Sequence, residues 1–193
     1  MKKINYIFLT MFFIICLCTG CGSKKEDVEV KNIEEKEEVL EKDISKKLTF
    51  ICDNNKIKVE TPNSWSEYKE EKMNDDACLE LIGADEIKYL IVISEEKSSF
   101  SSFNYWFDTV YSNVKESYQL DDSKIRRSDE GGLNTRFIEN ELEMNGEKVY
   151  LQLYFIETNN YYNQLLMWTE LDNKTLYNSE FRDIAYSLKE VEQ

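Results

Sequence analysis

The stretch LNTRFIENELEMNGEKVYLQLYFIETNNYYNQLLMWTEL, residues 133–171, decides the fold. Asn145-Gly146 is the strongest hairpin signal in the chain, because both residues can adopt the positive φ that a two-residue turn needs. After this turn, apolar residues recur at every second position over residues 149–155, which is the period of a strand. Asn159-Asn160 gives a second turn, and residues 161–171 form a third strand. The stretch therefore predicts an antiparallel meander of three strands.

Shorter strands precede the meander. Residues 48–52 and 57–62 form a hairpin around Asn54-Asn55, and Pro62 ends its second strand because proline cannot donate to a ladder. Residues 78–82 and 89–93 are two further strands. The second of these is apolar on both faces, so we expect it at the centre of the sheet.

Two segments have the 3.6-residue period of amphipathic helices. The first follows Ser101 and Ser102, either of which can cap its N-terminus. Its apolar positions are Phe103, Phe107, Val110, Val114 and Tyr118. The second begins at Thr175, and its apolar positions are Tyr177, Phe181, Ile184, Ala185, Leu188 and Val191. The fold class is therefore α+β: an antiparallel sheet with a three-strand C-terminal meander, covered by two main helices.

This order of elements resembles the PsbP-like α/β/α sandwich. A Pro-x-x-Trp step after an early strand, here Pro62-Asn63-Ser64-Trp65, and the ending Ile184-Ala185-Tyr186-Ser187-Leu188-Lys189 are similar to motifs of that group. Leu188 stands where the ending usually has phenylalanine. The resemblance covers nearly all of residues 48–191. It implies a mainly non-enzymatic protein, because known members are extrinsic photosystem subunits or protein-binding adaptors, and many bacterial lipoproteins with the fold have no assigned role.

The N-terminus has the order of a secretory signal: Lys2 and Lys3, an apolar run over residues 6–17, and then small residues. The run is too short to span a bilayer. Cys18-Thr19-Gly20-Cys21 resembles the box of a bacterial lipoprotein signal, although leucine usually stands where Cys18 is. We therefore expect residues 1–20 to be removed and Cys21 to carry the lipid. The alternatives are an uncleaved anchor and an ordinary signal peptide cleaved nearby.

Residues 21–47 are expected to be a lipidated cysteine followed by a flexible tether. Residues 22–47 contain seven lysines and nine acidic residues among 26 positions, too polar to bury a core. As a coil the tether would reach about 28 Å. The alternative is a short helix along Ile33, Leu40 and Ile44. Residues 48–193 then form a single globular domain.

Charge excludes several classes of function. The chain has 24 basic and 38 acidic residues and a net charge of −14, which argues against nucleic-acid binding. It has no histidine, so metals that prefer nitrogen ligands are not expected, and neither is any cofactor. Asp121-Asp122 and Asp129-Glu130 lack the spacing of a calcium loop and are interpreted as surface. Arg126-Arg127, with Lys124 nearby, is the only compact basic group, and it is interpreted as a loop balanced by those acids.

No catalytic constellation is visible, so we expect a protein that is not an enzyme. Without histidine, catalysis needs paired carboxylates, an activated serine–lysine pair or a thiolate. Residues 48–193 have no Gly-x-Ser-x-Gly, phosphate loop or Cys-x-x-Cys. Two carboxylates brought together by the fold would leave no local signature, so an envelope hydrolase is the least favoured alternative.

The sequence allows two alternative roles for each of two groups of residues. Cys52 and Cys78 are the two cysteines of the mature domain, and they either form a disulfide or remain two buried thiols. Several aromatic residues either fill the core or form a recognition patch for a glycan, a peptide or a protein. The candidates for that patch are Tyr105, Trp106, Tyr111, Tyr150, Tyr154 and Trp168.

These observations predict a lipoprotein anchored through Cys21 to the outer face of a bacterial cell membrane. Its domain is expected to bind another envelope protein, as an adaptor. The alternative is a carrier of a small apolar ligand or lipid, which would need an apolar cavity.

Overall fold

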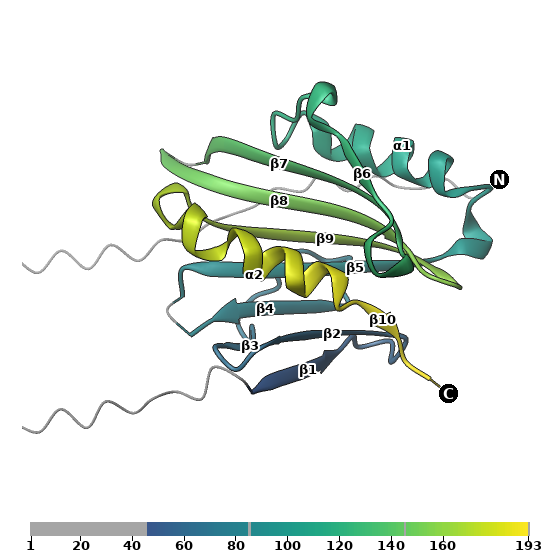
Figure 1. The fold of residues 1–193 in the computed structure, drawn as a ribbon, viewed down its shortest axis with the longest axis horizontal. Helices are drawn as coiled ribbons and strands as arrows, with labels where there is room; N and C mark the ends of the chain where they lie inside the picture. Colours follow the sequence, from purple (N-terminus) through teal and green to yellow (C-terminus); the bar gives the residue numbers. More distant parts are fainter. Residues whose placement is uncertain (1–45, 85, 145, 193) are drawn as a thin grey trace, which may run out of the picture. The chain divides into compact units, whose positions relative to one another are not determined.

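Two antiparallel sheets make up the globular part of the chain (Figure 1). The computed structural model describes residues 46–84, 86–144 and 146–192. The larger sheet has seven strands in the order β3-β4-β5-β9-β8-β7-β6. Their bounds are β3 Trp65–Glu67, β4 Leu79–Gly83, β5 Lys88–Glu96, β6 Arg126–Ser128, β7 Asn134–Met144, β8 Glu147–Glu157 and β9 Tyr161–Glu170.

The meander forms as the sequence predicts. Strands β7 and β8 pair from Asn134↔Glu157 to Met144↔Glu147, and β8 pairs with β9 along its length. Gly146 takes φ 86°, the left-handed conformation that a tight hairpin requires. Asn145, the other residue of the hairpin signal, lies outside the described residues. Strand β5 pairs with β9 and therefore lies in the middle of the sheet, as its apolar sequence indicated.

The N-terminal hairpin belongs to a second, smaller sheet. Strands β1 (Lys47–Ile51) and β2 (Ile57–Pro62) form it, and β10 (Lys189–Glu190) pairs with the other side of β2. The predicted C-terminal helix is therefore too long, because it ends before this strand. Ser187 marks the change: its Oγ accepts from the Glu60 N–H at 2.8 Å, which fixes the chain beside β2, and lies 2.7 Å from the Ile184 carbonyl of the helix, to which it donates.

The two helices lie on opposite faces of the seven-stranded sheet (Figure 1). Helix α1 (Phe103–Lys115) places Trp106 against Phe155 of β8, with ring centroids 5.9 Å apart. Helix α2 (Lys174–Tyr186) places Tyr186 against Tyr154, the preceding residue of the same strand, at 6.0 Å. Successive residues of a strand point to opposite faces, so the sheet is covered on both sides. Single 3₁₀ turns connect these elements: η1 Lys97–Ser99, η2 Asp122–Lys124, η3 Glu130–Gly132 and η4 Leu171–Asn173.

Helix α1 begins where predicted but buries a wider face. Ser102 is the N-cap, and its Oγ accepts a hydrogen bond from the Tyr105 N–H at 3.2 Å. Trp106 and Tyr111 are buried beside Phe107, because steps of three and four residues bring them to the same side of the helix. The helix ends at Lys115, one turn before the predicted Tyr118, which is buried in the turn that follows.

The sequence misses both edge strands of the larger sheet. Strand β3 contains Trp65 of the Pro-x-x-Trp step, and β6 contains Arg126 and Arg127, which the sequence placed in a loop. Each has only three residues, so neither shows a period. The α+β class, with antiparallel sheets and two helices, is as predicted.

Candidate functional site

The predicted recognition aromatics are mostly core residues. Trp106, Tyr111, Tyr150, Tyr154 and Trp168 are each at most 7% exposed. The prediction that they form a recognition patch is therefore wrong for these five residues. A sheet covered by helices on both faces uses its large side chains for packing. Tyr105 on α1 is 57% exposed and is the one candidate that stays on the surface.

Cys52 and Cys78 form a disulfide, with Cα atoms 4.9 Å apart, inside the range that a disulfide can bridge. Cys52 follows β1 and Cys78 precedes β4, so the bond links the small sheet to the larger one. Of the two alternatives that the sequence left open, the structure has the bonded pair. Cys21, the predicted lipidation site, lies outside the described residues.

A buried lysine lies between the larger sheet and α2. Lys88 Nζ donates to Glu180 Oε1 at 2.6 Å and to Ser64 Oγ at 3.2 Å. The ammonium group also lies 4.4 Å from the ring centroid of Tyr177 and 5.0 Å from that of Trp65. The side chain of Lys88 is only 3% exposed, against 22% for Glu180.

This cluster contains a serine–lysine pair, but its geometry does not suit nucleophilic catalysis. A serine is activated by an amine that has a free lone pair. Here a carboxylate and two aromatic faces stabilise the charged ammonium, which donates to Ser64 rather than accepting its proton. Gly83 completes the packing, since a Cβ at this position would overlap the Lys88 stem. The cluster is therefore structural.

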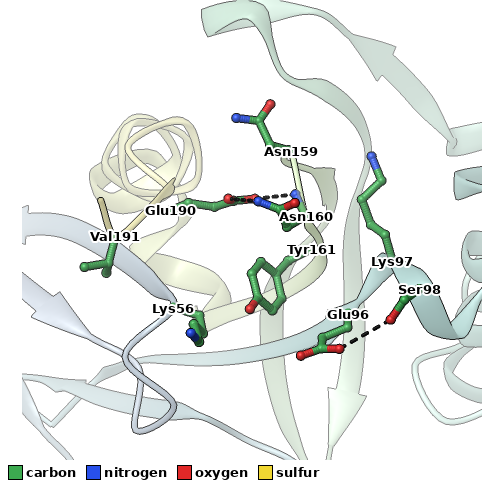
Figure 2. A pocket seen from close by; sticks show the side chains of 9 residues that line it. All are labelled: Lys56, Glu96, Lys97, Ser98, Asn159, Asn160, Tyr161, Glu190 and Val191. Atoms are coloured by element: carbon green, nitrogen blue, oxygen red, sulfur yellow. Dashed lines mark hydrogen bonds between the residues drawn. The ribbon is translucent and has the colours of Figure 1, made fainter. Parts of the chain in front are cut away.

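A surface hollow lies where both sheets end (Figure 2). It has a volume of about 620 Å³. Four separate segments line it: the β1–β2 turn, the end of β5 with η1, the β8–β9 turn and the C-terminal strand. The lining residues are Lys56, Glu96, Lys97, Ser98, Asn159, Asn160, Tyr161, Glu190 and Val191.

One wall of this polar hollow is held by Glu190. Its carboxylate accepts from the Asn160 backbone N–H at 2.6 Å and from Asn160 Nδ2 at 2.8 Å, as Figure 2 shows. Desolvation raises the pKa of Glu190, but the hydrogen bonds it accepts lower that pKa by more, so it lies below the ordinary value for glutamate. The ionised glutamate therefore links β10 to the β8–β9 turn through these hydrogen bonds.

The other wall holds a mixture of charges. Lys97 turns away from the Tyr161 ring in Figure 2 and donates to Glu157 Oε1 at 2.5 Å. Within the described residues, the Lys56 ammonium makes no ion pair, so it is the cation that the hollow offers. Desolvation, followed by the charges of Glu96 and Glu190, raises the pKa of Tyr161, so its hydroxyl remains a donor.

The lining of the polar hollow is mostly charged or amide side chains. Its donors and acceptors suit a polar group that both gives and accepts hydrogen bonds, such as a peptide amide or a charged side chain. Ser98 Oγ donates to Glu96 Oε2 at 3.3 Å. Sequence reasoning found Asn159-Asn160 only as a turn and missed Glu190, because it extended the last helix over that position.

Two further findings concern metals and membranes. Among residues 46–84, 86–144 and 146–192, no group of three histidine, cysteine, aspartate or glutamate side chains is placed to hold a metal ion. In the same ranges, neither helix has the length and apolar character needed to cross a bilayer.

Comparisons with known proteins identify the fold. No protein-family model and no curated protein matches this chain. The solution structure of cyanobacterial PsbP (CyanoP) from Synechocystis sp. PCC 6803 is similar with a TM-score of 0.58 and 13% identity, over 75% of this chain and 92% of that chain. A crystal structure from Bacteroides thetaiotaomicron VPI-5482 is similar with a TM-score of 0.54 and 12% identity, over 75% of this chain and 48% of that chain. At such low identities the likeness shows the fold alone, and the fold of this chain is PsbP-like.

Proposed function

We propose that this chain is a lipid-anchored, extracytoplasmic binding domain that engages another envelope protein and catalyses no reaction. The observation that carries the proposal is the polar hollow. Four chain segments line it, and it contains the ionised Glu190 but no activated nucleophile. Its volume is in the range of binding sites, about 300 to 1,000 Å³.

The nature of the lining favours a polar partner over an apolar cargo. A carrier of lipid or of a small apolar ligand needs a mostly apolar cavity. The larger hollow has charged or amide side chains at most positions, and the smaller one, about 270 Å³ beside α2, includes Lys47, Glu60, Glu180 and Asp183. A protein segment is the polar ligand that fits a membrane-tethered domain.

Anchoring is the first part of the proposal to test. Cys21→Ser removes the sulfur that would carry the lipid, so the variant should move from the membrane fraction to the soluble fraction of the cell. Cys16→Ser, in the apolar run and outside the box, is the matched control and should stay with the membrane. Tight membrane association of Cys21→Ser would mean that the signal segment itself is the anchor.

Binding is the second part. We would crosslink cells that express the anchored protein, capture it and identify what comes with it by mass spectrometry. Ser98→Arg with Asn159→Arg fills the hollow from two exposed positions, and Glu71→Arg, on the loop between β3 and β4, is the control. We expect one dominant envelope protein that the filled hollow loses and the control keeps. Recovery of the protein alone, or of the same partner with all variants, would contradict the proposal.

A further inference from the structure

All four arginines of the chain lie at one end of the larger sheet, although 20 of its 24 basic residues are lysines. Arg126 and Arg127 form most of the edge strand β6, and Arg136 lies on the neighbouring strand β7. Arg182 reaches the same place from α2, where its Nη2 contacts Glu130 Oε2 at 2.5 Å just after β6. We call these four residues the arginine edge.

On the α1 face of this edge, two arginines lie directly opposite each other. Arg127 pairs with Arg136 across β6 and β7, so their side chains are neighbours with the same charge. Arg136 stacks on Phe107, with its guanidinium carbon 4.2 Å from the ring centroid, and donates to Asn104. Its nearest carboxylate, Asp108, lies 3.9 Å away and is 74% exposed. The pair is therefore only weakly compensated.

The other face of the edge carries Arg126. It lies opposite Phe137, which stacks on Tyr154 on the α2 side of the sheet. Arg126 and Arg127 are both exposed, and within the described residues neither side chain forms an ion pair. Among the strands of the described residues, β6 pairs with β7 alone, so no described strand covers its outer edge. Strand β6 thus presents unpaired backbone groups and one of its own two guanidinium groups on each face.

We propose that the arginine edge is the docking site for a short acidic segment of a partner polypeptide, which adds to β6 as an extended strand. An added strand places consecutive side chains on opposite faces, so two adjacent carboxylates would meet Arg127 and Arg126. Arginine binds carboxylates through paired N–H donors. Charged, short edges normally prevent strand addition, and two arginines repel basic or apolar strands while admitting an acidic one.

Two observations favour a peptide over a phosphate-rich polymer or an anionic membrane. Residues 48–193 contain 29 acidic and 15 basic residues, so an extended anionic surface would be repelled by most of the domain. A short segment avoids that repulsion. The free backbone of β6 also offers hydrogen bonds that only another polypeptide backbone can complete in register.

This inference rests on the proposed function, since it names the chemistry of the partner. To test it, we would titrate the intact protein with the blocked peptide Thr-Thr-Glu-Glu-Thr-Thr at low salt and follow backbone amide signals by NMR. The peptide Thr-Thr-Gln-Gln-Thr-Thr is the matched control ligand. We expect shifts centred on β6 and the facing part of β7, and binding roughly tenfold weaker for Arg126→Ser with Arg127→Ser. Lys69→Ser with Lys72→Ser, which removes the same charge elsewhere, should bind like the wild type.

Three outcomes would overturn the inference: no shifts on β6, equal affinity for the glutamine peptide, or shifts on β6 caused by phosphatidylglycerol vesicles and not by the peptide. The proposed function is judged separately. If cells still yield one dominant partner and Arg126→Ser with Arg127→Ser leaves its recovery unchanged, the docking site is wrong while the binding function stands.

Discussion

At the scale of single residues, the ion pair of Lys88 and Glu180 joins a buried ammonium group to a partly exposed carboxylate. Two charges are taken out of water, and their attraction offsets that cost only when the geometry is good and other hydrogen bonds are satisfied. Trp65 Nε1 and Lys88 Nζ both donate to Glu180 Oε1, at 2.8 Å and 2.6 Å. Lys88 is more buried than Glu180, so leaving Lys88 without its partner should cost more free energy than leaving Glu180 without its partner.

Glu180→Gln should therefore lower the free energy of unfolding by about 3 kcal/mol, because it leaves a buried ammonium without its counter-charge. Lys88→Met should cost less, since Glu180 is partly exposed and can be hydrated. Urea denaturation of both variants measures the difference. Glu141→Gln, from the exposed pair with Lys174, is the control and should leave the stability nearly unchanged. If Lys88→Met were the more costly variant, this account of the pair would be wrong.

Glu190 gives a prediction in pH. Its pKa is lowered in the folded protein, mainly by hydrogen bonds that outweigh desolvation, so its ionised form stabilises the fold. That contribution is complete above the unfolded pKa, about 4.3, and is lost as the pH falls through the lower folded pKa. Glu190→Gln should thus be less stable than the wild type at pH 7, and the difference should shrink below about pH 4. Denaturation at both pH values tests this, with Glu192→Gln as the control. A difference independent of pH would contradict it.

At the scale of elements, the start of α1 depends on one side chain. Ser102 accepts from the Tyr105 N–H, which would otherwise lack a partner at the helix N-terminus. Ser102→Ala should cost about 1 kcal/mol in the free energy of unfolding. Ser101→Ala is the matched control, because Ser101 lies outside the cap. Equal effects of the two substitutions in thermal or urea denaturation would show that the cap is not the source of stability.

Long elements, in which the period repeats several times, could be predicted from the sequence. The shortest elements could not. The strands of the meander have ten or eleven residues, long enough for alternation and turn residues to define them. Strands β3, β6 and β10 have two or three residues, and tertiary pairing alone defines them. Leu188 fitted the helical period of α2 and is buried, but it packs from the segment after the helix.

The same limit applies to the candidate site. Lys56, Asn160 and Glu190 come from three turns or edges far apart in the sequence, and none shows a pattern by itself. The aromatic residues did show a pattern, but it was that of the core. Only the positions of the turns at Asn54-Asn55 and Asn159-Asn160, which bring two walls of the hollow together, could be predicted.

At the scale of the whole molecule, the disulfide is the covalent link between the two sheets. It joins residues 26 positions apart, so reducing it should destabilise the domain by about 3 kcal/mol through the greater freedom of the unfolded chain. Urea unfolding with and without reductant measures this, and Cys52→Ala with Cys78→Ala should be insensitive to reductant. An unchanged midpoint in the wild type on reduction would contradict the prediction.

The central claim is that the anchored domain binds an envelope protein through its polar hollow. The most direct test is photo-crosslinking in cells, with a photoreactive residue placed singly at Ser98 in the hollow, at Arg126 on the arginine edge and at Glu71 as a control. We predict a discrete crosslinked protein from Ser98, and also from Arg126 if the acidic segment docks there, but not from Glu71. The same faint adducts from all three positions would contradict the claim.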